Sequence, residues 1–116
     1  MSKEQWVAKS NEIRIPNQMF IDGEFVSAVS GATFDAISPI DQRVLAKVAA
    51  GDSHDVDKAV AAAKRTFENG VWRDLNPRDK KAIMLKWADL IREHYEEIAL
   101  LETLEVGKPK IGRAHV

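Results

Sequence analysis

Three histidines, His54, His94 and His115, are the side chains of this chain best suited to acid–base chemistry or metal binding near neutral pH. They lie far apart in the sequence, and no two have the spacing of a ligand pair, so exposed or helix-end histidines are favoured over a site. The 116 residues include no cysteine, which removes disulfides, thiolate metal ligands and thiol nucleophiles from this chain.

Two runs rich in carboxylates, over residues 52–57 and 93–97, have the composition of a metal site or an acid–base pair. Both stand where a helix is expected to begin, and negative charge there complements the helix dipole, which is the favoured interpretation. Trp72 and Trp87 could stack on a base or cofactor, but Trp87 falls on an apolar helix stripe and is expected in a core. The Gly-Lys-Pro at 107–109 follows a helix and lacks the other residues of a phosphate loop, so phosphate binding is excluded.

The composition is that of an ordinary globular protein: 45% of the residues are hydrophobic, 30% are charged, and the formal net charge is −1. Acidic and basic residues are interspersed, which argues against a nucleic-acid partner. The N-terminal stretch has no apolar run that would serve as a signal peptide, and nothing approaches the roughly 20 apolar residues of a membrane span. A cytoplasmic protein without a membrane partner is expected.

Short strands are expected in the first half of the chain. Residues 1–17 are polar and Pro16 favours an extended residue before it, so a flexible or loosely docked N-terminal arm is expected. The Asp-Gly pair at 22–23, between two apolar segments, predicts a hairpin with a type I′ turn. Further strands are predicted at 33–37 and 44–48, so four short strands would form a small antiparallel or meandering sheet.

Amphipathic helices are expected in the second half, where the apolar period changes from two to 3.6. The first is capped at 52–53 and ends at Gly70, and the next begins with the Asn-Pro pair at 76–77. The stripe loses register around His94 and restarts, so either two consecutive helices or one kinked helix ends at Gly107. The residues expected to face a core are Val56, Ala59, Val60, Ala63, Phe67, Ile83, Trp87, Leu90, Ile91, Ile98, Leu101 and Leu104.

The segments follow one another in a recognisable order: MFIDGEFV, then TFDAISPIDQRVLAKVAAGDSHDVDKAVAAAKRTFENGVW, then RDKKAIMLKWADLIREHYEEIALLETLEVGKP. Together they resemble the N-terminal part of the aldehyde dehydrogenase superfamily, from about Gln18 to Pro109. The hairpin, the proline turn, the capped Ala-rich helix and the LETL-V-GKP ending occur in the family's order. Trp6 and the IRIP before the hairpin are most similar to the branch acting on amino-aldehydes, such as the gamma-glutamyl-aminobutyraldehyde dehydrogenases.

The resemblance implies an α/β fold. Residues 18–109 would form an incomplete, Rossmann-like cofactor-binding domain, with an N-terminal arm, short antiparallel strands and then two to three amphipathic helices. It also implies a parent that oxidises an aldehyde with NAD or NADP through a cysteine thiohemiacetal, and that assembles as a dimer or tetramer. The family's catalytic groups and cofactor-phosphate loop match no position here. No catalytic or cofactor-binding residue is assigned, and the chain alone is expected to bind no cofactor and to be inactive.

One site transfers by resemblance. Many family members hold a structural monovalent cation through backbone carbonyls before the Ser/Asn-Pro turn and an acidic side chain near the end of the LETL helix. The matching positions are Ala36 or Ile37, and Glu105. Glu stands where Asp is usual, so the longer side chain would displace the ion or reach it differently. The alternative is that Glu105 is a solvated helix-end residue.

Residues 110–116, KIGRAHV, lack an amphipathic period and do not resemble the family's next helix. IGRAHV is the translation of ATC GGA AGA GCA CAC GTC, a string that matches a common short-read sequencing adapter. A non-family tail on a truncated gene is therefore expected, with a genuine short tail as the alternative. For the whole chain, the alternative to a dehydrogenase fragment is a stand-alone, non-catalytic α/β module that binds a partner through its helix faces. A fragment is expected to leave apolar faces exposed at Phe67, Trp87 and Leu101.

Overall fold

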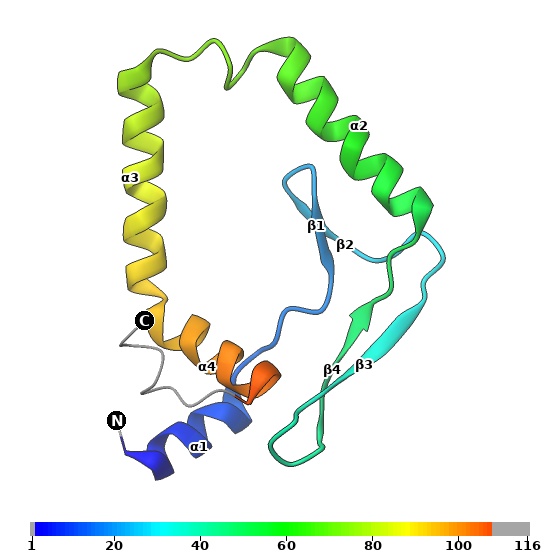
Figure 1. The fold of residues 1–116 in the computed structure, drawn as a ribbon, viewed down its shortest axis with the longest axis vertical. Coiled ribbons are helices and arrows are strands. Elements are labelled where there is room, and N and C mark those ends of the chain that lie inside the picture. Colours follow the sequence, from blue (N-terminus) through cyan, green and yellow to red (C-terminus); the bar gives the residue numbers. More distant parts are fainter. Residues whose placement is uncertain (1, 108–116) are drawn as a thin grey trace.

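The computed structural model describes residues 2–107, so the tail expected at 110–116 lies outside the described residues. The fold is α/β, as predicted. Its elements follow in the order α1 (Lys3–Glu12), β1 (Met19–Ile21), β2 (Glu24–Val26), β3 (Thr33–Ile37), β4 (Val44–Ala49), α2 (Ser53–Asn69), α3 (Pro77–Glu93) and α4 (Tyr95–Val106). Helices α2, α3 and α4 form an open arch around the β1–β2 hairpin (Figure 1). No helix of the described range is long and apolar enough to cross a membrane.

The β1–β2 hairpin forms as predicted around Asp22 and Gly23. Both residues have positive φ, 55° and 79°, which is the left-handed backbone that a type I′ turn requires. The strands pair antiparallel with Phe20 opposite Phe25, and the centroids of these two rings lie 5.1 Å apart. The turn chemistry therefore sets the register of this hairpin.

The prediction of one small sheet is wrong, because the strands of the described range form two separate antiparallel pairs, β1–β2 and β3–β4. The connection after β2 does not fold back as a further strand of the first pair. Instead, the backbone N–H of Val29 donates to the carboxylate of Asp55 on α2, and Gly31 turns the chain at a φ of 75°. A backbone bond from the N–H of Ala49 to the carbonyl of Asn17 links the end of β4 to the segment before β1.

The helices after β4 begin and end at the predicted signals. The side chain of Asp52 caps α2, and Gly70 ends it with a φ of 77°. Asn76 caps α3, which has proline in its first turn. The loss of register around His94 corresponds to a break between α3 and α4, so of the two alternatives the structure shows two consecutive helices. Gly107 ends α4 with a φ of 76°.

The N-terminal arm contains a helix, α1, that the sequence analysis did not predict. Ser2 caps this helix, and the Gln5 side chain accepts from the backbone N–H of Ser2 at 2.7 Å, which completes a capping box. The docking of α1 is polar: Lys9 Nζ lies 3.2 Å from Glu96 Oε2 on α4, and Arg43 donates to the last turn of α1. The Ser-x-x-Gln pattern was the available signal for this helix, but its polar composition gives no apolar period to support it.

The arch leaves the apolar faces of its helices open to solvent. The fragment interpretation predicts this exposure, and it is confirmed at Phe67 and Trp87, so the core expected for these faces is not present in the described range. The radius of gyration is 17.8 Å, against about 13 Å for a compact chain of this length. Buried apolar side chains of the described range are confined to Ala28, Ala99, Leu100 and Leu104, while Leu101 is half-buried. The predicted core residues that are instead 44% to 63% exposed are Val56, Val60, Phe67, Ile83, Trp87, Leu90, Ile91 and Ile98.

Candidate functional site

The segment expected to contribute carbonyls to a cation site lies at the end of β3. The pairing of β3 with β4 shifts register between Ala36 and Ile37, and such an irregularity re-aims the backbone locally. Ser38 follows and is only 1% exposed; its hydroxyl accepts from the N–H of Ile40, and its own N–H donates to the carbonyl of Arg43 at 2.9 Å. The turn after Ile37 is therefore fixed by both side-chain and backbone hydrogen bonds.

The C-terminal end of α4 packs against this same turn. A Cβ added to Gly107 would lie 3.1 Å from Pro39 Cγ, so this end of the helix is in close contact with the proline. Glu105 lies two residues earlier and is exposed, and the Ile37 side chain is 53% exposed. The structure thus brings the two segments of the candidate cation site together. Within the described range no cluster of three or more His, Cys, Asp or Glu side chains could hold a metal, so backbone carbonyls would have to complete any cation site.

An apolar groove, with a volume of about 730 Å³, lies between the tip of the β1–β2 hairpin and α2. Phe20, Phe67 and Trp72 are its aromatic lining residues. The ion pair between Asp22 Oδ1 and Arg65 Nη2, 2.7 Å long, ties the hairpin tip to α2 across this groove. Sequence reasoning missed the groove because it depends on how a hairpin and a distant helix are oriented.

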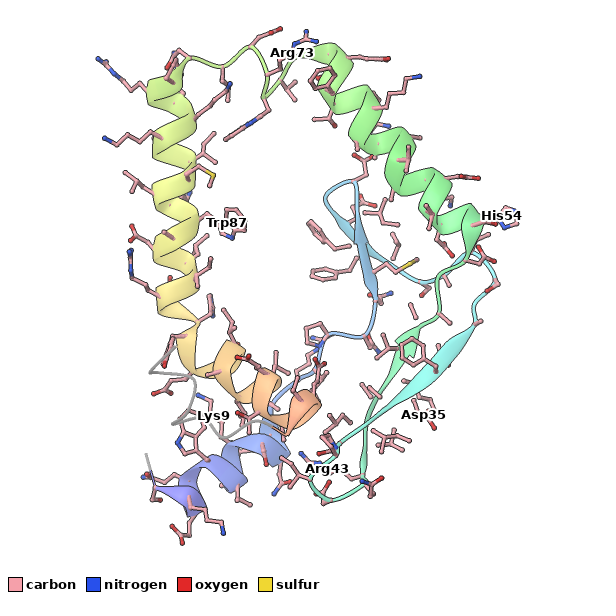
Figure 2. All side chains as sticks on the ribbon, in the orientation of Figure 1. Lys9, Asp35, Arg43, His54, Arg73 and Trp87 are labelled. Atoms are coloured by element: carbon pink, nitrogen blue, oxygen red, sulfur yellow. The ribbon has the colours of Figure 1, made fainter. Side chains whose placement is uncertain are left out.

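Arg73 and Lys80 are the two cations that line the groove. Arg73 lies where α2 leads into α3 (Figure 2). The Arg73 guanidinium carbon lies 5.1 Å from the centroid of the Phe67 ring, and Lys80 Nζ lies 5.9 Å from that of Trp72. Arg73 also pairs with Asp74 at 3.0 Å. The groove is therefore lined by apolar and aromatic residues beside two cations, and its lining residues include no histidine or cysteine that could act as a nucleophile or general base.

Asp55 is the buried carboxylate of the described range, at 3% exposure. It accepts from the backbone N–H groups of Asp52 and Val29, each at 2.9 Å. The hydrogen bond from Asp52, followed by that from Val29, holds the pKa of Asp55 below its ordinary value of 3.8, because both bonds favour the charged form; burial acts in the opposite direction. The carboxylate thus fastens the connection at 27–32 to the first turn of α2, which is a structural role.

Replacing Asp55 by Ala is expected to release this connection. The Val29 amide should exchange its hydrogen for deuterium at least about tenfold faster, because it loses its acceptor. In the unchanged chain, Asp55 has a lowered pKa. The protection of the Val29 amide against exchange is therefore fully present at a pH above the ordinary pKa of an aspartate, and it is lost as the pH falls through the pKa of Asp55 in the folded state. Amide exchange followed by nuclear magnetic resonance measures both effects. Asp57→Ala, which removes an exposed carboxylate of the same helix, is the control, and equal exchange in both variants would contradict the assignment.

The histidines singled out in the sequence lie apart in the structure. His54 Nδ1 is 3.4 Å from Asp52 Oδ1 at the start of α2, and His94 Nδ1 is 4.0 Å from Glu97 Oε2 at the start of α4. Both occupy helix ends, as predicted, and His115 lies outside the described residues. The carboxylate runs likewise lie at helix starts, where Asp52 caps α2 and the acidic residues of α4 stand in its first turn.

Residues 25–114 match the Aldehyde dehydrogenase family. The chain therefore belongs to the aldehyde dehydrogenase family, and the resemblance noted in the sequence is confirmed. The matched region extends into residues 110–114, to which the sequence analysis assigned a non-family tail and which lie beyond the described residues.

Individual relatives show how much of a family member this chain represents. NADP/NAD-dependent aldehyde dehydrogenase PuuC of Escherichia coli is 45% identical over 104 residues, which are 90% of this chain and 21% of PuuC. The crystal structure of gamma-glutamyl-gamma-aminobutyraldehyde dehydrogenase from Burkholderia cenocepacia is 52% identical with a TM-score of 0.88, covering 90% of this chain and 21% of that one. Indole-3-acetaldehyde dehydrogenase AldA of P. syringae, solved in complex with NAD+ and IAA, is 44% identical with a TM-score of 0.93, covering 95% and 22%.

The chain thus spans about a fifth of the relatives that it matches. At these TM-scores the elements of this chain have the same arrangement as the matching part of the two solved enzymes.

Proposed function

We propose that this chain is the N-terminal segment of an NAD- or NADP-dependent aldehyde dehydrogenase whose parent oxidises an aldehyde to a carboxylic acid. The observation that carries the proposal is the superposition on a solved relative, at a TM-score of 0.88, over 21% of that relative. The names of PuuC and of the AldA complex with NAD+ support the choice of cofactor.

The parent's substrate is proposed to be an amino-aldehyde. The support is the 52% identity with gamma-glutamyl-gamma-aminobutyraldehyde dehydrogenase, which is higher than the 44% identity with the indole-3-acetaldehyde enzyme. A cytoplasmic parent that assembles as a dimer or tetramer, without nucleic-acid or membrane partners, completes the proposal. NAD and NADP stay open as alternatives.

The chain's own contribution is a scaffold. In the family a cysteine thiolate forms a thiohemiacetal with the aldehyde and hydride passes to the nicotinamide. The 116 residues contain no cysteine, so they cannot supply that nucleophile. What they supply is a hairpin held to α2 by the Asp22–Arg65 ion pair, and three helices, α2, α3 and α4, that carry exposed large apolar side chains.

A chimera tests the proposed function directly. Residues 2–107 of this chain replace the matching segment of PuuC, and aldehyde-dependent formation of NADH and NADPH is measured. We expect the chimera to retain activity, because the rest of PuuC would pack against α2, α3 and α4 of this segment. A second chimera with the corresponding segment of the Burkholderia cenocepacia enzyme controls for the two junctions. An inactive first chimera beside an active second one would refute the proposal.

We further propose that the end of β3 and Glu105 hold a structural monovalent cation in the parent. The close contact of Gly107 with Pro39 supports this proposal, because it brings the C-terminal turn of α4 to the turn that follows Ile37. Carbonyl and carboxylate oxygens are hard donors, and hard cations prefer such ligands.

Exchange of the salt in the buffer tests the cation site. In the PuuC chimera, Na+ or K+ is expected to raise the melting temperature relative to tetramethylammonium at equal ionic strength, and Glu105→Gln is expected to abolish most of this rise. An ion that binds only the folded state stabilises it by about 2.7 kcal/mol when its concentration is a hundred times Kd. Glu93→Gln, which removes an exposed carboxylate of α3, is the matched control. A rise of the same size in both variants would show that Glu105 is a solvated helix-end residue.

A further inference from the structure

We infer that Asn69 and Gly70, where α2 ends, form a site of spontaneous covalent modification at which the side-chain amide of Asn69 is converted to a carboxylate. The chemistry is ring closure by the backbone nitrogen of the residue that follows the asparagine. Neither residue belongs to the candidate cation site, and the reaction needs no partner other than water.

The reaction proceeds in two steps and involves no oxidation or reduction. The backbone nitrogen of Gly70 forms a bond to Cγ of Asn69, the bond from Cγ to the side-chain nitrogen breaks, and that nitrogen leaves as ammonia with the proton of the Gly70 N–H. The product is a five-membered succinimide ring. Water then opens the ring at one of its two carbonyls, which gives an aspartate or an isoaspartate whose main chain continues through the former side chain.

The residue types single out this pair among the four asparagines of the chain. A side chain on the following residue hinders ring closure, and glycine has none. Asn11 is followed by glutamate and Asn17 by glutamine, so both carry this hindrance. Asn76 is followed by proline, whose nitrogen has no hydrogen to lose and cannot close the ring.

The local structure favours ring closure at Asn69, which is exposed. Its Oδ1 accepts from the backbone N–H of Val71 at 3.1 Å, and this bond folds the side chain along the backbone of Gly70. The same bond stabilises the negative charge that develops on the oxygen when the nitrogen attacks. The N–H of Gly70 donates to the Phe67 carbonyl at 3.3 Å, longer than an ordinary backbone bond of about 2.9 Å, so it is weakly held.

The modification changes the junction between α2 and α3, where the chain turns from one side of the arch to the other (Figure 1). Either product places a negative charge at the C-terminal end of α2, where the helix dipole disfavours it. The carboxylate of Asp74 already lies against Gly70, because a Cβ on this glycine would collide with it. An isoaspartate also lengthens the main chain by one atom, which disturbs the left-handed residue that ends the helix. Trp72 and Arg73, which line the groove, follow directly.

Ageing of the 116-residue chain tests the inference. The chain is kept in buffer at neutral pH for several weeks, and samples are digested with trypsin and analysed by mass spectrometry. The four asparagines fall in separate tryptic peptides, and the peptide with Asn69 covers residues 66–73. We expect this peptide to gain the mass difference between amide and acid about tenfold faster than the peptides of Asn11 and Asn17, because glycine does not hinder the ring. An isoaspartyl methyltransferase should then methylate the aged peptide.

Asn69→Gln is the matched control for the reaction. It keeps the amide, but the longer side chain would have to close a less favourable six-membered ring, so residues 66–73 of this variant should keep their mass. Asn69→Asp reproduces one product, and the amides at the end of α2 should exchange hydrogen faster in it than in Asn69→Gln. Equal exchange in the two variants would contradict the expected effect on the junction.

The same incubation in concentrated urea separates the effect of the structure from that of the sequence. Conversion of Asn69 in buffer at no more than the rate of Asn11 and Asn17 would overturn the inference. Fast conversion in urea alone would overturn it as well, because the helix end would then hold Asn69 too rigidly for ring closure. A digest of the fresh chain excludes conversion during the digestion itself.

Discussion

The purified chain, mixed with NAD or NADP and an amino-aldehyde, is expected to form no reduced nicotinamide above the rate of a protein-free blank. Thiohemiacetal formation requires a thiolate, and none of the 116 residues is cysteine. The groove between the hairpin and α2 supplies no replacement, because no histidine lines it to activate Thr66. The absorbance of the reduced nicotinamide measures the rate, and intact PuuC under the same conditions shows that the assay works.

A rate above the blank would contradict this expectation only under two conditions. It has to follow the 116-residue chain through gel filtration, and it has to persist in a preparation from cells that lack PuuC. Such a rate would mean that the chain carries chemistry of its own, and would remove the reason for regarding it as a scaffold.

The isolated chain is also expected to unfold without a sharp transition, despite its helical content. Caps and turns stabilise α2 and α3 locally, so far-ultraviolet circular dichroism should show helix. Cooperative melting, however, requires a shared core, and Phe67 and Trp87 are 63% and 59% exposed. The chain should therefore bind the dye ANS strongly and lose helix gradually on heating.

The alternative of a stand-alone module makes the opposite prediction. A module with its own core would melt in one step, with the same midpoint by circular dichroism and by tryptophan fluorescence. It would also bind little ANS. That result would favour a partner-binding module over a segment of an enzyme, and it would contradict the arch as the state of the chain in solution.

The local features of the fold were readable from single residues and pairs. The Asp-Gly pair at 22–23 predicted the hairpin, because a type I′ turn requires positive φ at both of its central residues and few residue types tolerate it. Asp52 and Asn76 marked helix starts because their side chains accept hydrogen bonds from backbone N–H groups that a helix leaves free. Gly107 marked a helix end because glycine adopts the left-handed backbone that ends a helix. Such signals act over a few residues, and the sequence displays them directly.

Features that depend on distant contacts were not readable in this way. The Val29 amide bonds to Asp55, 26 residues later, in the connection between the two strand pairs that the sequence suggested as one sheet. The apolar period correctly identified the inner sides of α2 and α3, but periodicity shows which side is apolar and not what covers it. Val60 and Trp87 lie on the apolar faces that the period predicts, yet both are 59% exposed, as a fragment of a larger fold would leave them.

Of the candidate site, the resemblance supplied the positions, and the structure shows that their two segments are in contact. Ile37 and Glu105 are 68 positions apart in the sequence, and the contact between Gly107 and Pro39 joins their segments. Nothing in the residue types around Glu105 indicates this contact, apart from the glycine whose missing Cβ leaves room for the proline.

The open arch also implies an order of events during protein synthesis. In a relative such as PuuC, the hairpins and capped helices of this segment can form while the chain is still being made, because their contacts are mostly local. Their apolar inner side then stays exposed until the ribosome has synthesised the rest of the chain. At about 5–20 residues per second this exposure lasts tens of seconds. Nascent chains of the family are therefore expected to present this surface to molecular chaperones during translation, and ribosome-bound chains paused at this length should be enriched among their clients.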